Sequence, residues 1–247
     1  MPRPESYREG QPRWIALESS DPPRARRFYA GLFGWTFADS SPEGHVDCLL
    51  GGARVAGVLP GPADRWLVYL SVADAEATAG AALTHGAGAI VIDRAGARAT
   101  TVLLDDPTGA RVGGWQAASH PGLEVMWQPG SPVWFETVTR DFAAASAFYT
   151  AVFGWTLEVL SDDDDFRFST FGSGREAMTG IEDGARYPGG EPSSWVVYFG
   201  VADADAAVAR ALELGGTLRA SVEDTPFGRL AQLADPVGAA FRVMQEP

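Results

Sequence analysis

Two stretches of nearly identical sequence decide the fold: FYAGLFGW at residues 28–35 and FYTAVFGW at residues 148–155. A copied loop would confine the similarity to these stretches, whereas a copied domain would extend it. The similarity does extend, and it links RWIALESSD (13–21) with VWFETVTRD (133–141), WLVYLSVADAEA (66–77) with WVVYFGVADADA (195–206), and DPTGARVGGWQ (106–116) with DPVGAAFRVMQ (235–245). The chain is therefore a tandem duplication. The FY…FGW residues fall at a helix end and at the turn into a strand, which favours a packing role.

A smaller unit repeats within each half. A β-like run ends in an aspartate, an alanine-rich helix follows, and three β-like segments come next. The sequence thus predicts four strand–helix–strand–strand–strand units. A Gly-, Pro- and Ser-rich stretch between the halves is typical of a linker. We expect one domain over residues 12–117, a linker over 118–131 and a second domain over 132–247.

Composition excludes several classes of protein. The 247 residues carry a net charge of −13, which disfavours nucleic acid as a partner. The single cysteine excludes an internal disulfide and a thiol-rich metal site, and no lysine is present for a Schiff base or a P-loop. The sequence shows neither a signal-peptide pattern nor a long apolar run, so we expect a cytoplasmic protein without a membrane partner.

The repeated βαβββ units, with FY…FGW after the first helix and DPxG before the last strand, resemble the vicinal oxygen chelate superfamily. This superfamily contains glyoxalase I, extradiol dioxygenases and the bleomycin- and fosfomycin-resistance proteins. The stretch DTPFGRLAQLADPVGA (224–239) is similar to the two-domain actinobacterial type. The resemblance implies an α+β fold of four βαβββ modules, which form two glyoxalase-like domains with cupped mixed sheets and helices outside. Whether each cup forms within one half or between the halves is left open.

The resemblance also implies a divalent metal, held by His, Gln or Glu on the first, fourth, fifth and eighth strands of a domain. Here the corresponding positions carry other side chains, namely Trp14, Leu67 and Gly113 in the first half and Trp134, Val196 and Arg242 in the second. The fourth strand offers only Glu176 or Glu182, between which the sequence does not decide. One carboxylate does not hold a catalytic metal ion. We therefore expect no metal and no cofactor.

Alternation along the strands predicts which residues line each cup. The predicted ligand-binding residues are Trp14, Glu18, Leu67, Tyr69, Arg111, Gly113 and Trp115 in the first half, and Trp134, Glu136, Val196, Tyr198, Arg242 and Met244 in the second. Aromatic strand residues are as often core as lining, and strand carboxylates are more often solvated than reactive. Arg242 would either orient an acidic ligand or form an ordinary ion pair.

These residues favour a metal-independent binding protein that sequesters a planar aromatic, antibiotic-like ligand, which would confer antibiotic resistance. No catalytic residue is assigned under this hypothesis. The alternative is a metal-independent hydroxylase, lyase or isomerase in which Glu18 or Glu136 is the base and Tyr69 or Tyr198 the acid. The expected partner is a small aromatic molecule. The chain would act as a monomer with an internal pseudo-dimer, or as a homodimer.

Overall fold

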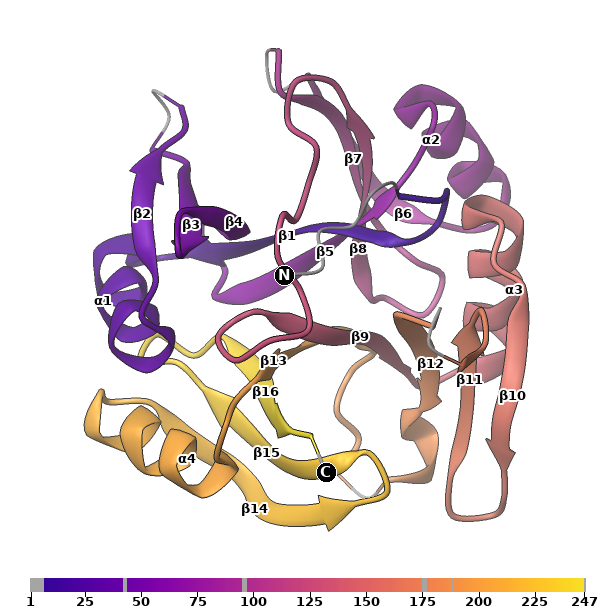
Figure 1. Ribbon diagram of the computed structural model, residues 1–247. Coiled ribbons are helices and arrows are strands. Elements are labelled where there is room, and N and C mark those ends of the chain that lie inside the picture. Colours follow the sequence, from indigo (N-terminus) through magenta and orange to yellow (C-terminus); the bar gives the residue numbers. More distant parts are fainter. Residues whose placement is uncertain (1–6, 42–43, 95–96, 175–176, 188, 247) are drawn as a thin grey trace.

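The computed structural model describes residues 7–41, 44–94, 97–174, 177–187 and 189–246. Two eight-stranded mixed sheets and four long helices form two similar domains, one from each half of the chain (Figure 1). The helices lie outside the sheets, as the resemblance implied. Both the α+β class and the two glyoxalase-like domains are thus confirmed. None of the helices described is long and apolar enough to cross a membrane.

The first domain contains two βαβββ units. Its elements are β1 (Pro12–Ser19), α1 (Pro22–Phe33), β2 (Thr36–Asp39), β3 (Val46–Leu50), β4 (Ala53–Pro60), β5 (Arg65–Ser71), α2 (Ala75–Thr84), β6 (Gly88–Arg94), β7 (Ala99–Asp105) and β8 (Arg111–Ala117). The strand order is β2-β3-β4-β1-β5-β8-β7-β6. The strands β1 and β5 run antiparallel at the centre, with Trp14 opposite Tyr69.

The second domain repeats this arrangement. Its elements are β9 (Pro132–Thr139), α3 (Phe142–Phe153), β10 (Leu157–Asp162), β11 (Arg167–Phe171), β12 (Thr179–Asp183), the 3-10 turn η2 (Gly184–Arg186), β13 (Ser194–Gly200), α4 (Ala204–Glu213), β14 (Thr217–Thr225), β15 (Gly228–Ala234) and β16 (Ala240–Gln245). The order β10-β11-β12-β9-β13-β16-β15-β14 matches that of the first sheet. Each cup therefore forms within one half. We call the inner faces of the two sheets the first cup and the second cup.

An aspartate that follows the first strand of each unit caps the N-terminus of the helix. The side chains of Asp21, Asp74, Asp141 and Asp203 each accept a hydrogen bond from a backbone N–H of the first helical turn. Gly34 ends α1 at φ 72° and Gly154 ends α3 at φ 68°, in the left-handed region that glycine tolerates. The FGW turn therefore sets the point at which the chain leaves the helix.

The FY…FGW residues form the core between the two domains. Tyr29 and Phe33 of α1 lie with their rings 5.7 and 6.2 Å from that of Phe241 in β16 of the other domain. In the second copy of the motif, the hydroxyl of Tyr149 on α3 donates a hydrogen bond of 2.9 Å to Oδ2 of Asp106 in the first domain. The repeated motif of one domain thus packs against the DPxG region and last strand of the other, which agrees with the predicted packing role.

The segment that connects the two sheets crosses the first cup. The backbone N–H of Leu123 donates to the carbonyl of Arg13, and that of Glu124 to the carbonyl of Arg54, both at 2.8 Å. The side chains of Leu123, Val125 and Met126 are buried. Part of the sequence expected to be a linker is therefore fixed against the inner face of the first sheet.

Candidate functional site

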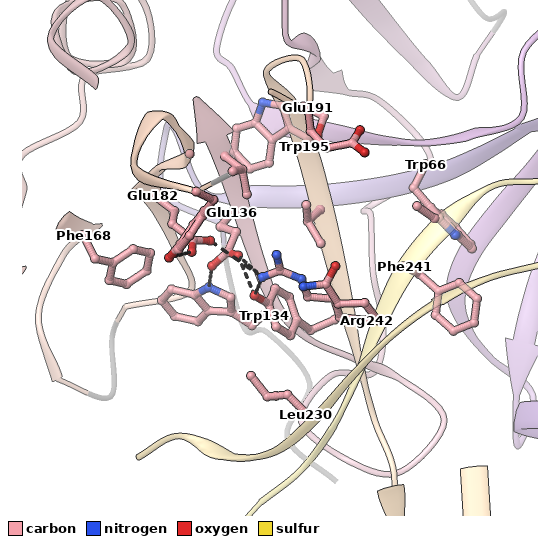
Figure 2. A pocket seen from close by; sticks show the side chains of 18 of the residues that line it. Trp66, Trp134, Glu136, Phe168, Glu182, Glu191, Trp195, Leu230, Phe241 and Arg242 are labelled. Atoms are coloured by element: carbon pink, nitrogen blue, oxygen red, sulfur yellow. Dashed lines mark hydrogen bonds and ion pairs between the residues drawn. The ribbon is translucent and has the colours of Figure 1, made fainter. Parts of the chain in front are cut away.

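The second cup opens into a cleft that continues along the boundary between the two domains and has a volume of about 1760 Å³. Its floor comes from the central strands β9, β13 and β16, and its sides from β11 and β12 and from the β14–β15 hairpin. Figure 2 shows Trp134, Glu136 and Arg242 close together, with Phe168 on one side and Leu230 on the other. The cleft thus combines a polar floor with apolar sides.

Three charged or polar side chains meet at this floor. Nη1 of Arg242 lies 2.7 Å from Oε1 of Glu136, and the hydroxyl of Tyr198 donates to the same oxygen at 2.5 Å. Nη1 of Arg242 also donates to the hydroxyl of Tyr198. The strand register brings these side chains together. Tyr198 on β13 pairs with Arg242 on β16, and Glu136 lies on the neighbouring strand β9 and faces the same side of the sheet.

A second carboxylate joins this group from β12. Oε2 of Glu182 lies 3.7 Å from Nη1 of Arg242, and Oε1 accepts a hydrogen bond of 2.6 Å from the hydroxyl of Tyr187. Nε1 of Trp134 donates to Oε2 of Glu136 at 3.1 Å. The guanidinium of Arg242 therefore contacts two carboxyl groups, those of Glu136 and Glu182.

The position of Glu136 favours its protonated form. The residue is 4% exposed, and burial, followed by the neighbouring charge of Glu182, raises its pKa to about 8. Arg242 acts in the opposite direction and does not cancel these effects. Burial and then the charge of Glu136 also raise the pKa of Tyr198 well above its usual value. The floor thus holds one guanidinium in contact with two carboxyl groups, of which Glu136 has the raised pKa.

Aromatic rings form one side of the cleft. The ring of Trp134 lies 6.2 Å from that of Phe168, and Phe168 is stacked on Phe166 at 5.8 Å with 19° between the planes. Trp134 and Phe166 are partly exposed. Phe227, in the turn between β14 and β15, is 53% exposed and also lines the cleft. These surfaces offer stacking contacts to a flat ligand.

The first cup is filled by its own side chains. Trp14, Tyr69 and Trp115 are 4, 8 and 6% exposed, and His120 from the connecting segment is 3% exposed. The imidazole lies 4.4 Å from the ring of Trp14 and 5.3 Å from that of Trp115. Tyr69 lies directly over Gly113, where an added Cβ would be 2.1 Å from Cδ1 of the ring. Trp14, Tyr69 and Trp115, predicted as ligand-binding residues, are thus packed against one another.

Charged groups close the first cup. Asp47 on β3 accepts from Nη2 of Arg98, which precedes β7, at 2.7 Å, and from Nε of Arg54 at 3.0 Å. Nε2 of His120 lies 3.9 Å from Oδ2 of Asp47. Burial, followed by the charge of Arg98, lowers the pKa of His120 to about 4. The Asp47–Arg98 pair joins the two sides of this cup above a neutral imidazole.

The remaining predicted site residues divide between the domains. Glu18 pairs with Arg65 at 2.9 Å, and Arg111 forms a bidentate pair with Asp105 at 2.6 and 2.9 Å. Leu67 is buried. The other two, Val196 and Met244, are partly exposed and line the cleft of the second cup. The structure thus brings together Trp134, Glu136, Val196, Tyr198, Arg242 and Met244, and places Arg111 at the domain boundary of the same cleft.

Several cleft residues were absent from the sequence-based set. Glu182 was one of two alternatives for the fourth strand, and its pairing with Val138 places it beside Glu136. Glu176, the other alternative, lies outside the described residues. Phe168 follows the DDDD run, and its alternation with Phe166 was an available signal. Tyr187 of the cleft and His120 of the first cup lie outside regular strands, where alternation gives no guidance.

The donor set of the second cup does not fit the divalent metal of the superfamily. Arg242 already places a fixed positive charge between Glu136 and Glu182, and Trp134 and Val196 occupy the first- and fifth-strand ligand positions. In the part of the chain that the structure describes, no group of three or more His, Cys, Asp or Glu side chains is arranged to hold a metal ion. The positive charge beside the two carboxyl groups is therefore supplied by the guanidinium of Arg242.

Comparisons with known proteins agree with this architecture. The model of the glyoxalase-like domain family matches residues 14–112 and 133–244. The chain is 34% identical to "Putative glyoxylase CFP32" of Mycobacterium tuberculosis, over 99% of this chain and 98% of the relative. It is also 34% identical to the anthracycline biosynthesis protein DauV of Streptomyces sp. strain C5, over 97% and 94%. The Mn(II)-bound glyoxalase from Novosphingobium aromaticivorans shares the fold with a TM-score of 0.67 and 13% identity, over 97% of this chain and 83% of that structure.

Proposed function

Because the chain belongs to the glyoxalase-like domain family, we propose that it is a binding protein that holds a flat aromatic molecule in the second cup without a metal. Sequestration of an antibiotic-like compound is the role that we propose for this binding. The name of DauV, an anthracycline biosynthesis protein, supports a ligand of this kind, since anthracyclines carry fused flat rings.

The observation that carries this proposal is the contrast between an aromatic side and a polar floor in one accessible cleft. Trp134 and Phe166 present partly exposed rings, while Glu136, Tyr198 and Arg242 offer hydrogen-bonding groups below them. Stacking supplies most of the buried apolar area in such a complex, and a few polar groups fix the ligand's orientation.

The test is a titration of the protein with an anthracycline and with simple anthraquinones, followed by tryptophan fluorescence and calorimetry. We expect saturable binding at one site per chain and intact ligand on recovery by mass spectrometry. Trp134→Leu should weaken binding on the order of tenfold or more, because one stacking surface is lost. Trp66→Leu is not a suitable control, since Trp66 also lines the cleft.

The matched control is Trp14→Leu, which changes the equivalent residue of the first cup. Any folded Trp14→Leu protein should bind the same ligands with unchanged affinity. Equal loss of binding in both variants, or the absence of saturable binding to the wild-type chain, would contradict the proposal.

A second candidate function rests on the carboxyl of Glu136. A protonated carboxyl with a pKa of about 8, hydrogen-bonded to Tyr198 and open to a cleft, is suited to general acid–base catalysis near neutral pH. This favours a hydroxylase, lyase or isomerase of small aromatic or carbonyl compounds. Conversion of a recovered ligand by the wild-type chain, together with its loss in Glu136→Gln, would establish the enzyme and refute pure sequestration.

A further inference from the structure

Among the residues that the structure describes, the hydrogen bonds of the Arg242 side chain all involve one guanidinium nitrogen, Nη1. Nη1 contacts Oε1 of Glu136, Oε2 of Glu182 and the hydroxyl of Tyr198. Its Cζ also lies over the Tyr198 ring, 5.1 Å from the centroid. These contacts fix one edge and one face of the planar group.

The opposite edge remains available. Within the described ranges of the chain, neither Nε nor Nη2 of Arg242 donates a hydrogen bond, although the residue lines the cleft and its side chain is 17% exposed. Figure 2 shows the dashed lines converging on one side of the guanidinium and none on the other. An arginine held on one edge presents two parallel N–H donors on the other, a geometry that matches two neighbouring acceptor oxygens.

We propose that Arg242 selects uncharged flat ligands that carry two adjacent acceptor oxygens, which accept hydrogen bonds from Nε–H and Nη2–H. This inference rests on the proposed function and specifies the ligand class of that same cleft. The aromatic side of the cleft holds the ring, and the free edge of Arg242 fixes its rotation within the cup.

The charges at the floor favour a neutral ligand over a carboxylate. Nη1 of Arg242 already contacts the buried carboxyl groups of both Glu136 and Glu182, so its single positive charge is shared between two acidic side chains. A ligand carboxylate would bring a further negative charge next to two buried acidic groups, which is unfavourable where water is scarce. Adjacent carbonyl and ether or hydroxyl oxygens offer the same two acceptors without that cost.

The experiment uses two isomers that differ only in the position of one oxygen. In 1-methoxyanthraquinone the methoxy oxygen neighbours a ring carbonyl, whereas in 2-methoxyanthraquinone it does not. Anthraquinone-2-carboxylate supplies the charged comparison. Calorimetric titrations of the full chain near pH 6.5 should show the 1-methoxy isomer binding on the order of tenfold more tightly than either other compound, as one additional hydrogen bond predicts.

The variant Arg242→Lys keeps the charge and removes the paired donors. It should bind both isomers with equal affinity. Arg229→Lys is the matched control, because Arg229 on β15 pairs with Asp205 and Asp224 outside the cup, and it should preserve the tenfold difference. Should Arg242→Lys fail to fold, the wild-type titrations of the two isomers still decide the question.

Three results would overturn the inference. If both isomers bind the wild-type chain equally, the proposed function stands and the selection by Arg242 is wrong. If the carboxylate binds most tightly, the ligand class is wrong. If no compound binds, both the proposed function and this inference fail.

Discussion

The two cups share a strand order and a register, yet one is filled and the other is open. Trp14 and Trp134 occupy equivalent positions on β1 and β9, opposite Tyr69 and Tyr198. Trp14 is enclosed by aromatic rings and His120, whereas Trp134 borders a cleft. The same residue type at the same place is therefore core in one domain and available to a ligand in the other.

One position on the last strand accounts for much of this difference. Gly113 leaves room for the ring of Tyr69 to lie against β8, but its counterpart Arg242 fills that space with a charged side chain. A charge at the floor must be balanced, and Glu136 and Glu182 provide this. The two copies thus differ at this position, with packed aromatic rings in the first cup and a charged cluster at the floor of the second.

The largest effect is expected from truncation of the equivalent tryptophans. Trp14→Ala removes a buried ring and should lower the free energy of unfolding by about 3–5 kcal/mol. Trp134→Ala should cost only about 1 kcal/mol, because the residue is partly exposed, and should mainly impair ligand binding. Urea denaturation measures the free energy of unfolding of both variants. Equal losses of stability would show that Trp14 and Trp134 are equally important to the packing of their cups.

A pH-dependent loss of stability should follow from Glu136. Its pKa is raised in the folded state to about 8, so between pH 4.5 and pH 8 the folded chain holds a proton that the unfolded chain has released. Stability should fall as pH rises through this window, by at most about 5 kcal/mol. Glu136→Gln should flatten the dependence in urea denaturation. A wild-type curve that is flat over the same range would refute the buried neutral carboxyl.

The first cup should respond to pH in the opposite direction. The pKa of His120 is lowered from 6.5 to about 4, so below pH 6.5 the unfolded chain binds a proton that the folded chain does not. Stability should fall as pH decreases from 6.5 to 4, by at most about 3 kcal/mol. His120→Gln should reduce this slope relative to wild type. NMR titration of the imidazole gives an independent check, since a midpoint near 6.5 would contradict burial of the neutral form.

The smallest effect is expected at Gly113, the position of the first cup that corresponds to Arg242 in the second. Gly113→Ala forces the ring of Tyr69 to move and should destabilise the chain by about 1–3 kcal/mol. Gly80→Ala in α2 is the control, because nothing lies near its added Cβ, and the better helix propensity of alanine should stabilise the chain by up to about 1 kcal/mol. Thermal unfolding measures both. A neutral Gly113→Ala would mean that Tyr69 has space to move.

The sequence was sufficient for the order of elements and for the orientation of most strand residues. The helical and strand periods of apolar residues, and the turn residues that interrupt them, determine the order of the elements. Trp134, Glu136, Tyr198 and Arg242 face one side of the sheet because side chains alternate along a strand. The state of each cup was not predictable in this way. It depends on His120, which lies in an irregular segment, and on the contact between Tyr69 and Gly113 across strands. Glu182 was ambiguous because the second half carries extra residues before β12, which shift the alignment.

The interlocked core between the domains ties ligand binding to the folding of the entire chain. Since Tyr29 and Phe33 complete the hydrophobic core of the other domain, and Tyr149 hydrogen-bonds to Asp106 across the boundary, neither half keeps its buried surface when separated. Unfolding should then be a single cooperative event. A molecule bound in the second cup would consequently raise the melting temperature of the first domain as well, with a stabilisation that grows with the logarithm of its concentration.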